Sequence, residues 1–281
     1  MPREAWHRWQ RNRAAVVCGA VFLAVAVLCY VGPSVAGAVG VDGTAIDAQL
    51  GATPPSAAHW FGTDTLGRDM LVRVMIGGQI AIAVALVAAA IAVAIGVTYG
   101  AVAAYAGGRI DNAMMRVVDA LYAFPTAAFV IVVMAVTGAR SLVALFALIG
   151  AISWLTMARI TRGQVLSLRH REFVLAARAL GAPAGRILVR HILPSAAGPV
   201  IVYASLALPQ VMLTEALLSF LGLGVQAPLA SWGTLVTEGS SQIVVYPWLL
   251  VFPGAVMGVA ILALNFIGDG LRDAFDPTQS R

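Results

Sequence analysis

Apolar residues occur along this chain in six long runs, separated by shorter polar segments. The runs lie near residues 14–36, 77–105, 114–138, 141–160, 197–222 and 247–268. Each is about as long as, or longer than, the roughly 20 residues that a helix needs to cross a bilayer. The pattern therefore predicts an all-α polytopic membrane protein with six transmembrane helices.

The first apolar run has two interpretations. Ala36-Gly37-Ala38 looks like a signal-peptide cleavage site behind an arginine-bearing start. The apolar stretch Ala14–Val31 is 18 residues long, however, whereas the apolar region of a secretory signal has about 7 to 15 residues. We therefore interpret this run as an uncleaved membrane anchor.

Arginine is distributed unevenly between alternate polar segments. If the N-terminus is inside, the outer segments hold only Arg68, Arg73 and Arg140 of the 18 arginines. The inner segments hold Arg3, Arg8, Arg11, Arg13, Arg109, Arg116, Arg159, Arg162, Arg169, Arg171, Arg178, Arg186, Arg190, Arg272 and Arg281. Inner loops of membrane proteins are enriched in basic residues, so we expect both termini to be cytoplasmic.

Two polar segments are too long to be simple turns. The outer one, Val39–Ile76, contains four aspartates and Pro54-Pro55, and we expect a small external subdomain that ends in a short amphipathic helix before span two. The inner one is the loop 161–195. The chain thus divides into residues 1–76, with the cytoplasmic tail, first span and external subdomain, and residues 77–281, with five spans and the inner loop.

The inner loop has the pattern of two helices joined at a glycine. Every residue from Glu172 to Leu180 is compatible with a helix, and Gly181 follows where a left-handed C-terminal cap favours glycine. Pro183 suits the first turn of a second helix, expected over Ala184–Ile192 until Pro194 and Pro199 open the next span. We call Glu172–Ile192 the helix–glycine–helix segment.

This segment has a plain alternative role. An arginine-rich inner loop can simply enforce topology and contact anionic lipid. A topology signal needs only charge, however, and not a defined turn. Ala176, Ala177 and Ala179 also give the first helix a smooth face, rimmed by arginines, that another protein can approach closely. We therefore expect a docking surface for a cytoplasmic partner.

Composition narrows the functional class. Hydrophobic residues make up 60%, charged residues 11%, and the mean hydropathy is +0.88, far from the globular average of about 25% charged residues. All basic residues are arginines, because the chain contains no lysine. The net charge of +5 is no evidence for nucleic acid as a partner. Cys18 and Cys29 lie in the same apolar run, about 16 Å apart along a helix at roughly 1.5 Å per residue, and cannot pair there.

No catalytic motif is visible in the sequence. The spacing of the four histidines does not match a metal site; they are His7, His59, His170 and His191. There is no serine nucleophile motif, and there is no glycine-rich phosphate-binding loop with its lysine, because the chain has no lysine. We expect the chain to be no enzyme, to bind no cofactor or metal, and to hydrolyse no ATP by itself.

Two ionisable residues lie in apolar surroundings. A charged side chain at the bilayer centre costs on the order of 3 kcal/mol on insertion scales, so Asp119 and Glu215 are expected to face other helices or a watery path. Asp119 is either a packing contact near the inner interface or a pathway residue. Glu215 is either a gate residue or a buried structural hydrogen-bonding group. Gln210 joins them as a candidate for the pathway.

Four stretches carry a resemblance to a known family. The pattern Ala176-Ala177, Gly181 and Leu193-Pro194 resembles the cytoplasmic "EAA" loop of membrane subunits of ATP-binding-cassette importers. Three others resemble the C-type subunit of the dipeptide, oligopeptide and nickel permease family. They are Phe61–Asp69, Leu218–Gln226 with Ser231-Trp232-Gly233, and Asn265–Asp273. Their order covers nearly the whole chain and implies the type I importer permease fold.

The resemblance implies that the helix–glycine–helix segment couples the subunit to an ATPase. The implied coupling interface comprises Arg171, Glu172, Leu175, Ala176, Ala177, Arg178, Gly181, Ala182 and Arg186. The chain departs from the family pattern because Leu175 replaces the glutamate that names the loop, and His191 replaces the usual isoleucine before Pro194. Glu172, one turn before Leu175 on the same side, is a candidate substitute for the missing carboxylate.

The resemblance also implies partners. They are a second homologous permease subunit, one or two ATPase subunits that bind ATP and magnesium, an extracellular substrate-binding protein and membrane lipid, in a bacterial inner membrane. The candidate residues on the binding-protein side are Asp64, Arg68, Asp69, Gln226 and Trp232. Asp64, Arg68 and Asp69 could equally form internal salt bridges. The loop after span five could be a plain interfacial loop, with Trp232 and Trp248 at the membrane surface, or a re-entrant outer gate.

The substrate and the energy source have alternatives. Di- or oligopeptides are favoured over nickel because His59 is the only histidine placed outside. A secondary transporter driven by an ion gradient is the rival class, but we find no inverted repeat and few ionisable residues in the spans. A membrane-embedded enzyme is the weakest interpretation, since acid, base and metal residues are missing.

Overall fold

The described chain is built almost entirely from helices. A computed structural model describes residues 2–137 and 142–275, and within these ranges the only β-pairing is an isolated bridge between Thr63 and Asp69. The helices are α1 (Pro2–Arg11), α2 (Arg13–Ala38), α3 (Met70–Ala106), α4 (Gly108–Tyr122), α5 (Thr126–Thr137), α6 (Leu142–Leu168), α7 (Glu172–Ala179), α8 (Ala184–Ile187), the π-helix η1 (Leu188–Ile192), α9 (Leu193–Phe220), α10 (Trp232–Ser241) and α11 (Trp248–Phe275). The all-α prediction is confirmed.

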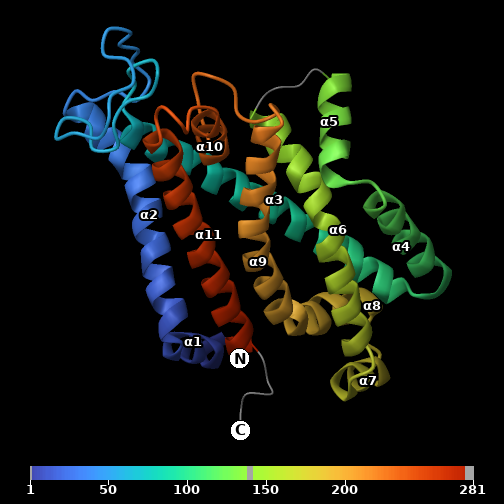
Figure 1. Cartoon of the computed structure of the whole chain (residues 1–281). Helices are drawn as coiled ribbons and strands as arrows, with labels where there is room; N and C mark the ends of the chain where they lie inside the picture. Colours follow the sequence, from blue (N-terminus) through green and yellow to red (C-terminus); the bar gives the residue numbers. More distant parts are fainter. Residues whose placement is uncertain (1, 138–141, 276–281) are drawn as a thin grey trace.

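The chain passes repeatedly between two opposite ends of a helical bundle (Figure 1). One end carries α1, α7, α8 and the C-terminal end of α11, and we call it the α7 end. The other carries α10 and the irregular segment that joins α2 to α3, and we call it the α10 end. The predicted inner loop 161–195 and the predicted outer segment between α2 and α3 therefore lie at opposite ends.

Four helical paths in the described residues are long and apolar enough to cross a membrane by themselves. They are α2, α3, the joined path Ala184–Phe220 and α11. α6 has 27 residues, but its second half contains Arg159 and Arg162. All four coincide with predicted spans, and α6 covers the predicted span 141–160 apart from residue 141, which lies outside the described residues.

The predicted continuous span 114–138 is wrong in one respect. The chain breaks between Tyr122 and Thr126, so the region consists of the amphipathic α4 and the apolar α5. Pro125 explains the break, because the residue before a proline is pushed out of the helical region. Residue 138 lies outside the described residues.

The short amphipathic helix expected to lead into span two is continuous with that span. Met70–Ile76 forms the first turns of α3, a single helix of 37 residues, so the division drawn after residue 76 falls inside it. At about 1.5 Å per residue this helix exceeds the roughly 30 Å bilayer core, and Figure 1 shows it running diagonally across its neighbours. Asp69 starts the helix, since its side chain accepts a hydrogen bond from the Val72 amide.

Close packing between α3 and α6 forms the centre of the bundle. A side chain at Gly96 would meet Met157 and the Trp154 carbonyl, and one at Gly100 would meet the Ala158 carbonyl. Two glycines spaced four residues apart let helix backbones approach closely in a membrane. This contact fixes α6, and thus the start of the helix–glycine–helix segment, relative to α3.

Candidate functional site

The helix–glycine–helix segment has the glycine turn that the sequence predicts. Gly181 has φ +77°, and the Gly181 and Ala182 amides donate to the carbonyls of Arg178 and Ala177 at 3.0 and 3.1 Å. This pair of bonds is the Schellman motif, which satisfies the last carbonyls of a helix. Pro183 then acts as the N-cap of α8, one position earlier than predicted.

The second helix of the segment does not end where it was predicted to end. α8 continues through η1 into α9 as one helical path from Ala184 to Phe220. Pro194 and Pro199 lie inside this path instead of opening a separate span. Pro194 occupies the first turn of α9, where a missing N–H is tolerated. The segment is therefore attached to a membrane-spanning helix without an intervening loop.

One face of the segment is anchored to the ends of α3 and α6. Val174, Ile187 and Ile192 are each at most 1% exposed and form an apolar cluster with residues of the other two helices, Ala101, Ala104 and Val165. The Arg169 guanidinium adds a hydrogen bond of 3.1 Å to the Ala104 carbonyl. A movement of α7 and α8 is therefore expected to displace the ends of α3 and α6. It would also displace the start of α9, with which α8 is continuous.

The opposite face of the segment is open in this chain. Seven of the nine residues expected at the coupling interface are exposed, namely Arg171, Glu172, Leu175, Ala176, Arg178, Gly181 and Arg186. Ala177 and Ala182 are half-buried and pack against the anchoring cluster. Leu180, at 87% exposure, and Phe173, at 42%, add apolar area that the sequence analysis did not single out. Such an exposed apolar surface is typical of a protein–protein contact.

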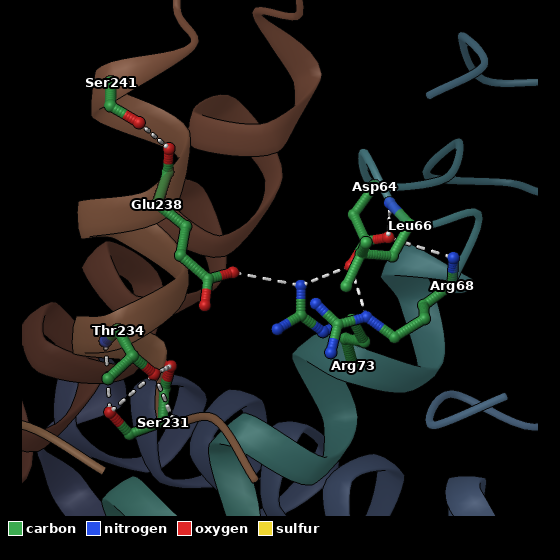
Figure 2. Close-up of polar contacts among 8 residues, drawn as sticks. All are labelled: Asp64, Leu66, Arg68, Arg73, Ser231, Thr234, Glu238 and Ser241. Carbon is green, nitrogen blue, oxygen red and sulfur yellow. Dashed lines mark hydrogen bonds and ion pairs between the residues drawn. The ribbon is translucent and has the colours of Figure 1, made fainter. Parts of the chain in front are cut away.

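A polar cluster at the α10 end joins the outer segment to α3 and α10 (Figure 2). Asp64 Oδ2 accepts hydrogen bonds from Arg68 Nε at 2.7 Å and from Arg73 Nη1 at 2.6 Å. Arg73 Nη1 also contacts Glu238 Oε2 of α10 at 3.1 Å. Asp64 Oδ1 accepts from the amides of Leu66 and Arg68. Asp64 is 4% exposed and Arg73 5%, so this cluster is mainly internal.

The other acidic residue expected on this side is internal as well. Asp69 caps α3, and its Oδ2 lies 2.8 Å from Nδ1 of His59. A cavity of about 400 Å³ opens beside the cluster, lined by Arg68, Arg73 and Glu238 on its charged side and by Leu229, Leu235 and Leu249 on its apolar side. Of the alternatives for Asp64, Arg68 and Asp69, the geometry favours internal ion pairs and a helix cap.

Comparison with known proteins identifies the family. A family model described as "Binding-protein-dependent transport system inner membrane component" matches residues 96–281. The chain belongs to this family. A second model, described as the N-terminal TM domain of oligopeptide transport permease C, matches residues 2–49. The resemblance seen in the sequence is confirmed.

The chain is similar to named relatives over almost its whole length. The chain is 44% identical over 275 residues to the Oligopeptide transport system permease protein OppC of Escherichia coli (strain K12), and the match covers 98% of this chain and 90% of the relative. It is 40% identical over 280 residues to the Dipeptide transport system permease protein DppC of Bacillus subtilis (strain 168), covering 99% and 86%.

The candidate pathway residues of this membrane component lie in three different environments. Gln210 is exposed on α9. The Asp119 side chain is 64% exposed and contacts Arg159 of α6 at 2.7 Å, with the Arg159 guanidinium 4.1 Å above the Tyr122 ring. Glu215 is 1% exposed and accepts hydrogen bonds from Ser219 and Ser231. Asp119 thus joins α4 to α6 through an exposed ion pair, whereas Glu215 is a buried hydrogen-bond acceptor.

The residues expected in the loop after span five are also placed differently. Gln226 is exposed, and its amide donates to the Gly224 carbonyl at 2.9 Å. Trp232 is 0% exposed and donates to the Val74 carbonyl at 2.8 Å, so its side chain lies inside the bundle. Trp248 is half-buried and donates to the Thr63 carbonyl. An ordered helix, α10, takes the place of a plain interfacial loop.

A polar pair near the α7 end was missed by the sequence analysis. The Arg162 guanidinium of α6 donates to both carboxylate oxygens of Asp111 of α4. Nε lies 2.6 Å from Oδ1 and Nη2 lies 2.8 Å from Oδ2. Asp111 is 6% exposed. The two residues are 51 positions apart, so no local pattern indicates their pairing.

Replacing Arg73 with alanine is expected to lower the stability of the outer cluster strongly. The change leaves Asp64 buried with one of its two guanidinium partners, and removing one member of a buried ion pair typically costs about 3 to 5 kcal/mol. We expect a decrease of several degrees in the Tm of the detergent-purified component. Glu238→Gln is the matched control, because the Glu238 side chain is 54% exposed and exposed pairs contribute about 0 to 1 kcal/mol. Equal shifts in both variants would contradict a dominant buried pair.

Proposed function

We propose that this chain is a permease subunit of an ATP-driven importer of di- or oligopeptides. The observation that carries the proposal is the exposed helix–glycine–helix segment, whose buried face is anchored on α3 and α6 and which continues directly into α9. A short helix attached to the bundle in this way can pass a rigid-body movement to the spans. The peptide substrate is supported by relatives that are named oligopeptide and dipeptide permeases.

The chain would act as one half of a membrane pathway. Its companions would be a second homologous permease subunit, one or two ATPase subunits that bind ATP and magnesium, and an extracellular substrate-binding protein. The α7 end, with both termini, would face the cytoplasm, as the arginine distribution favours. The ATPases would dock at Arg171, Glu172, Leu175 and the Gly181 turn, and Glu172 would supply the carboxylate that Leu175 lacks.

The opposite end would receive the binding protein. Gln226 and the half-exposed Glu238 are accessible there, whereas Asp64 and Asp69 would act indirectly by holding the outer segment in place. Substrate would then pass along the interface with the second permease subunit, where the exposed Gln210 and Asp119 are candidates to line the path. Substrate choice would rest mainly with the binding protein.

Uptake by reconstituted vesicles tests this proposal. The chain, co-purified with its partner subunits and supplied with the binding protein, should take up labelled peptide only with ATP and magnesium. Uptake should persist after an ionophore collapses the proton gradient. Loss of uptake with the gradient, or uptake by the chain alone, would indicate a secondary transporter. Accumulation of nickel in place of peptide would indicate the nickel branch of the family.

A further inference from the structure

The α10 helix is fixed tightly at the end of the bundle that carries it. The Trp232 ring is fully buried and hydrogen-bonded to α3. A side chain at Gly233 would lie 2.6 Å from the Ala216 Cα of α9, and one at Gly239 would meet the Leu249 backbone of α11. Glycine at these two positions thus brings α10 into direct backbone contact with its neighbours. The contacts at Gly233 and Gly239 hold α10 close to α9 and α11.

Glu215 connects α9 to the first turn of α10. Its Oε1 atom accepts hydrogen bonds from the Ser231 hydroxyl at 2.6 Å and the Ser219 hydroxyl at 2.8 Å. Ser231 is the N-cap of α10 and also accepts from the Thr234 amide. Ser219, in contrast, is on α9 itself, one turn after Glu215. Of these two bonds to Glu215, the one from Ser231 crosses between α9 and α10.

The helix that carries Glu215 also carries half of the helix–glycine–helix segment. The path Ala184–Phe220 is helical throughout, with Ile187 in the anchoring cluster at the α7 end and Glu215 at the α10 end. Figure 1 shows the path turning once, where α8 and η1 meet α9. Along its length α9 packs against α3, α6 and α11. A displacement of α8 therefore has a continuous helical connection to α10.

We propose that Glu215 is a positioning residue that makes α10 move together with α9, so that ATP-driven displacement of the helix–glycine–helix segment reaches the outer face. The inference rests on the proposed function. A buried side chain with hydrogen-bond partners often serves stability alone. The crossing bond to Ser231 distinguishes the two roles, because it links the segment driven by the ATPases to the helix that faces the binding protein.

Three single-hydroxyl variants test this inference in the assembled transporter. Ser231→Ala removes the bond that crosses between the helices, Ser219→Ala removes the equivalent donor within α9, and Thr234→Val disturbs the same helix cap without touching Glu215. In vesicles with binding protein and peptide, we expect Ser231→Ala to raise the ATP hydrolysed per peptide transported about tenfold. Ser219→Ala and Thr234→Val should stay within about threefold of the unmodified complex.

A second pair of variants keeps the test decisive if Ser231→Ala fails to assemble. Glu215→Gln retains an oxygen that accepts both hydroxyl hydrogen bonds, whereas Glu215→Leu has a similar size and no acceptor. We expect Glu215→Gln to keep the ratio of ATP hydrolysed to peptide transported that the unmodified complex has. Glu215→Leu should raise this ratio without lowering the yield of assembled complex. Normal coupling in Glu215→Leu would overturn the proposal. An equal loss of coupling in all three hydroxyl variants would also overturn it. The same holds if transport falls only in proportion to the yield of assembled complex. Failure of the unmodified complex to import peptide with ATP would instead contradict the proposed function.

Discussion

Replacing Gly181 with valine is expected to abolish ATP-driven uptake while leaving the subunit inserted in the membrane. Gly181 has φ +77°, and this left-handed conformation costs an L-residue roughly 1 to 2 kcal/mol and is most unfavourable for β-branched side chains. A Cβ atom at this position would meet nothing within 4 Å. The expected effect therefore comes from the backbone and not from a steric clash.

The functional loss follows from the direction of α7. Without the left-handed residue, the bonds from Gly181 and Ala182 to the end of α7 cannot both form, so α7 changes its angle to α8. The buried anchors Val174 and Ile187 belong to the two sides of this turn and would no longer fit the same cluster together. An ATPase docked on α7 would then move it without displacing α9.

A graded series makes the prediction quantitative. Uptake per assembled complex should fall in the order Gly181, Gly181→Asn, Gly181→Ala, Gly181→Val, because asparagine tolerates the left-handed region better than alanine and valine tolerates it worst. We expect at least a tenfold loss for valine. Gly163→Val is the control, since Gly163 is exposed on α6 and also has no atom within 4 Å. Normal uptake by Gly181→Val, or equal loss in the control, would contradict the docking hypothesis.

The spans and the glycine turn were predictable because each depends on local sequence. A membrane helix is encoded by a continuous apolar run, and the runs coincide with α2, α3, α6, α9 and α11. The turn at Gly181 is encoded by a helix-compatible stretch, one glycine and a proline two residues later. Pro125 also carried a local signal, and the break between α4 and α5 could have been predicted from it.

The contacts between helices were not predictable in the same way. Arg73 and Glu238 are 165 positions apart, and Glu215 finds its crossing partner only because α10 folds back onto α9. Tryptophan is a residue type that is common at membrane interfaces, yet the fold buries the Trp232 side chain completely. A side chain's type indicates which partners it needs, whereas the packing of distant segments decides which partner it has. Gly96 and Gly100 are an exception, because their four-residue spacing is a packing signal that sequence analysis can use.

Replacing Gly100 with alanine is expected to reduce the amount of folded subunit severely. The added Cβ atom would collide with the Ala158 carbonyl oxygen and would lie 3.0 Å from the Ala158 carbonyl carbon and from the Arg162 amide nitrogen. These are backbone atoms of α6, so no side-chain rotation can relieve the collision. Forcing extra atoms into a packed interior costs typically about 1 to 3 kcal/mol, and here whole helices must separate. We expect a lower Tm in detergent and a several-fold lower membrane level.

The matched control changes the same single atom where space is available. Gly254 lies in α11, and a Cβ atom there would meet nothing within 4 Å, so Gly254→Ala should keep the level and Tm of the unmodified chain. Separation of α3 from α6 would also displace the cluster around Val165 that anchors the helix–glycine–helix segment. Any Gly100→Ala protein that does assemble should therefore show reduced uptake per complex. A stable Gly100→Ala subunit with normal uptake would show that α3 and α6 are not in backbone contact at this position.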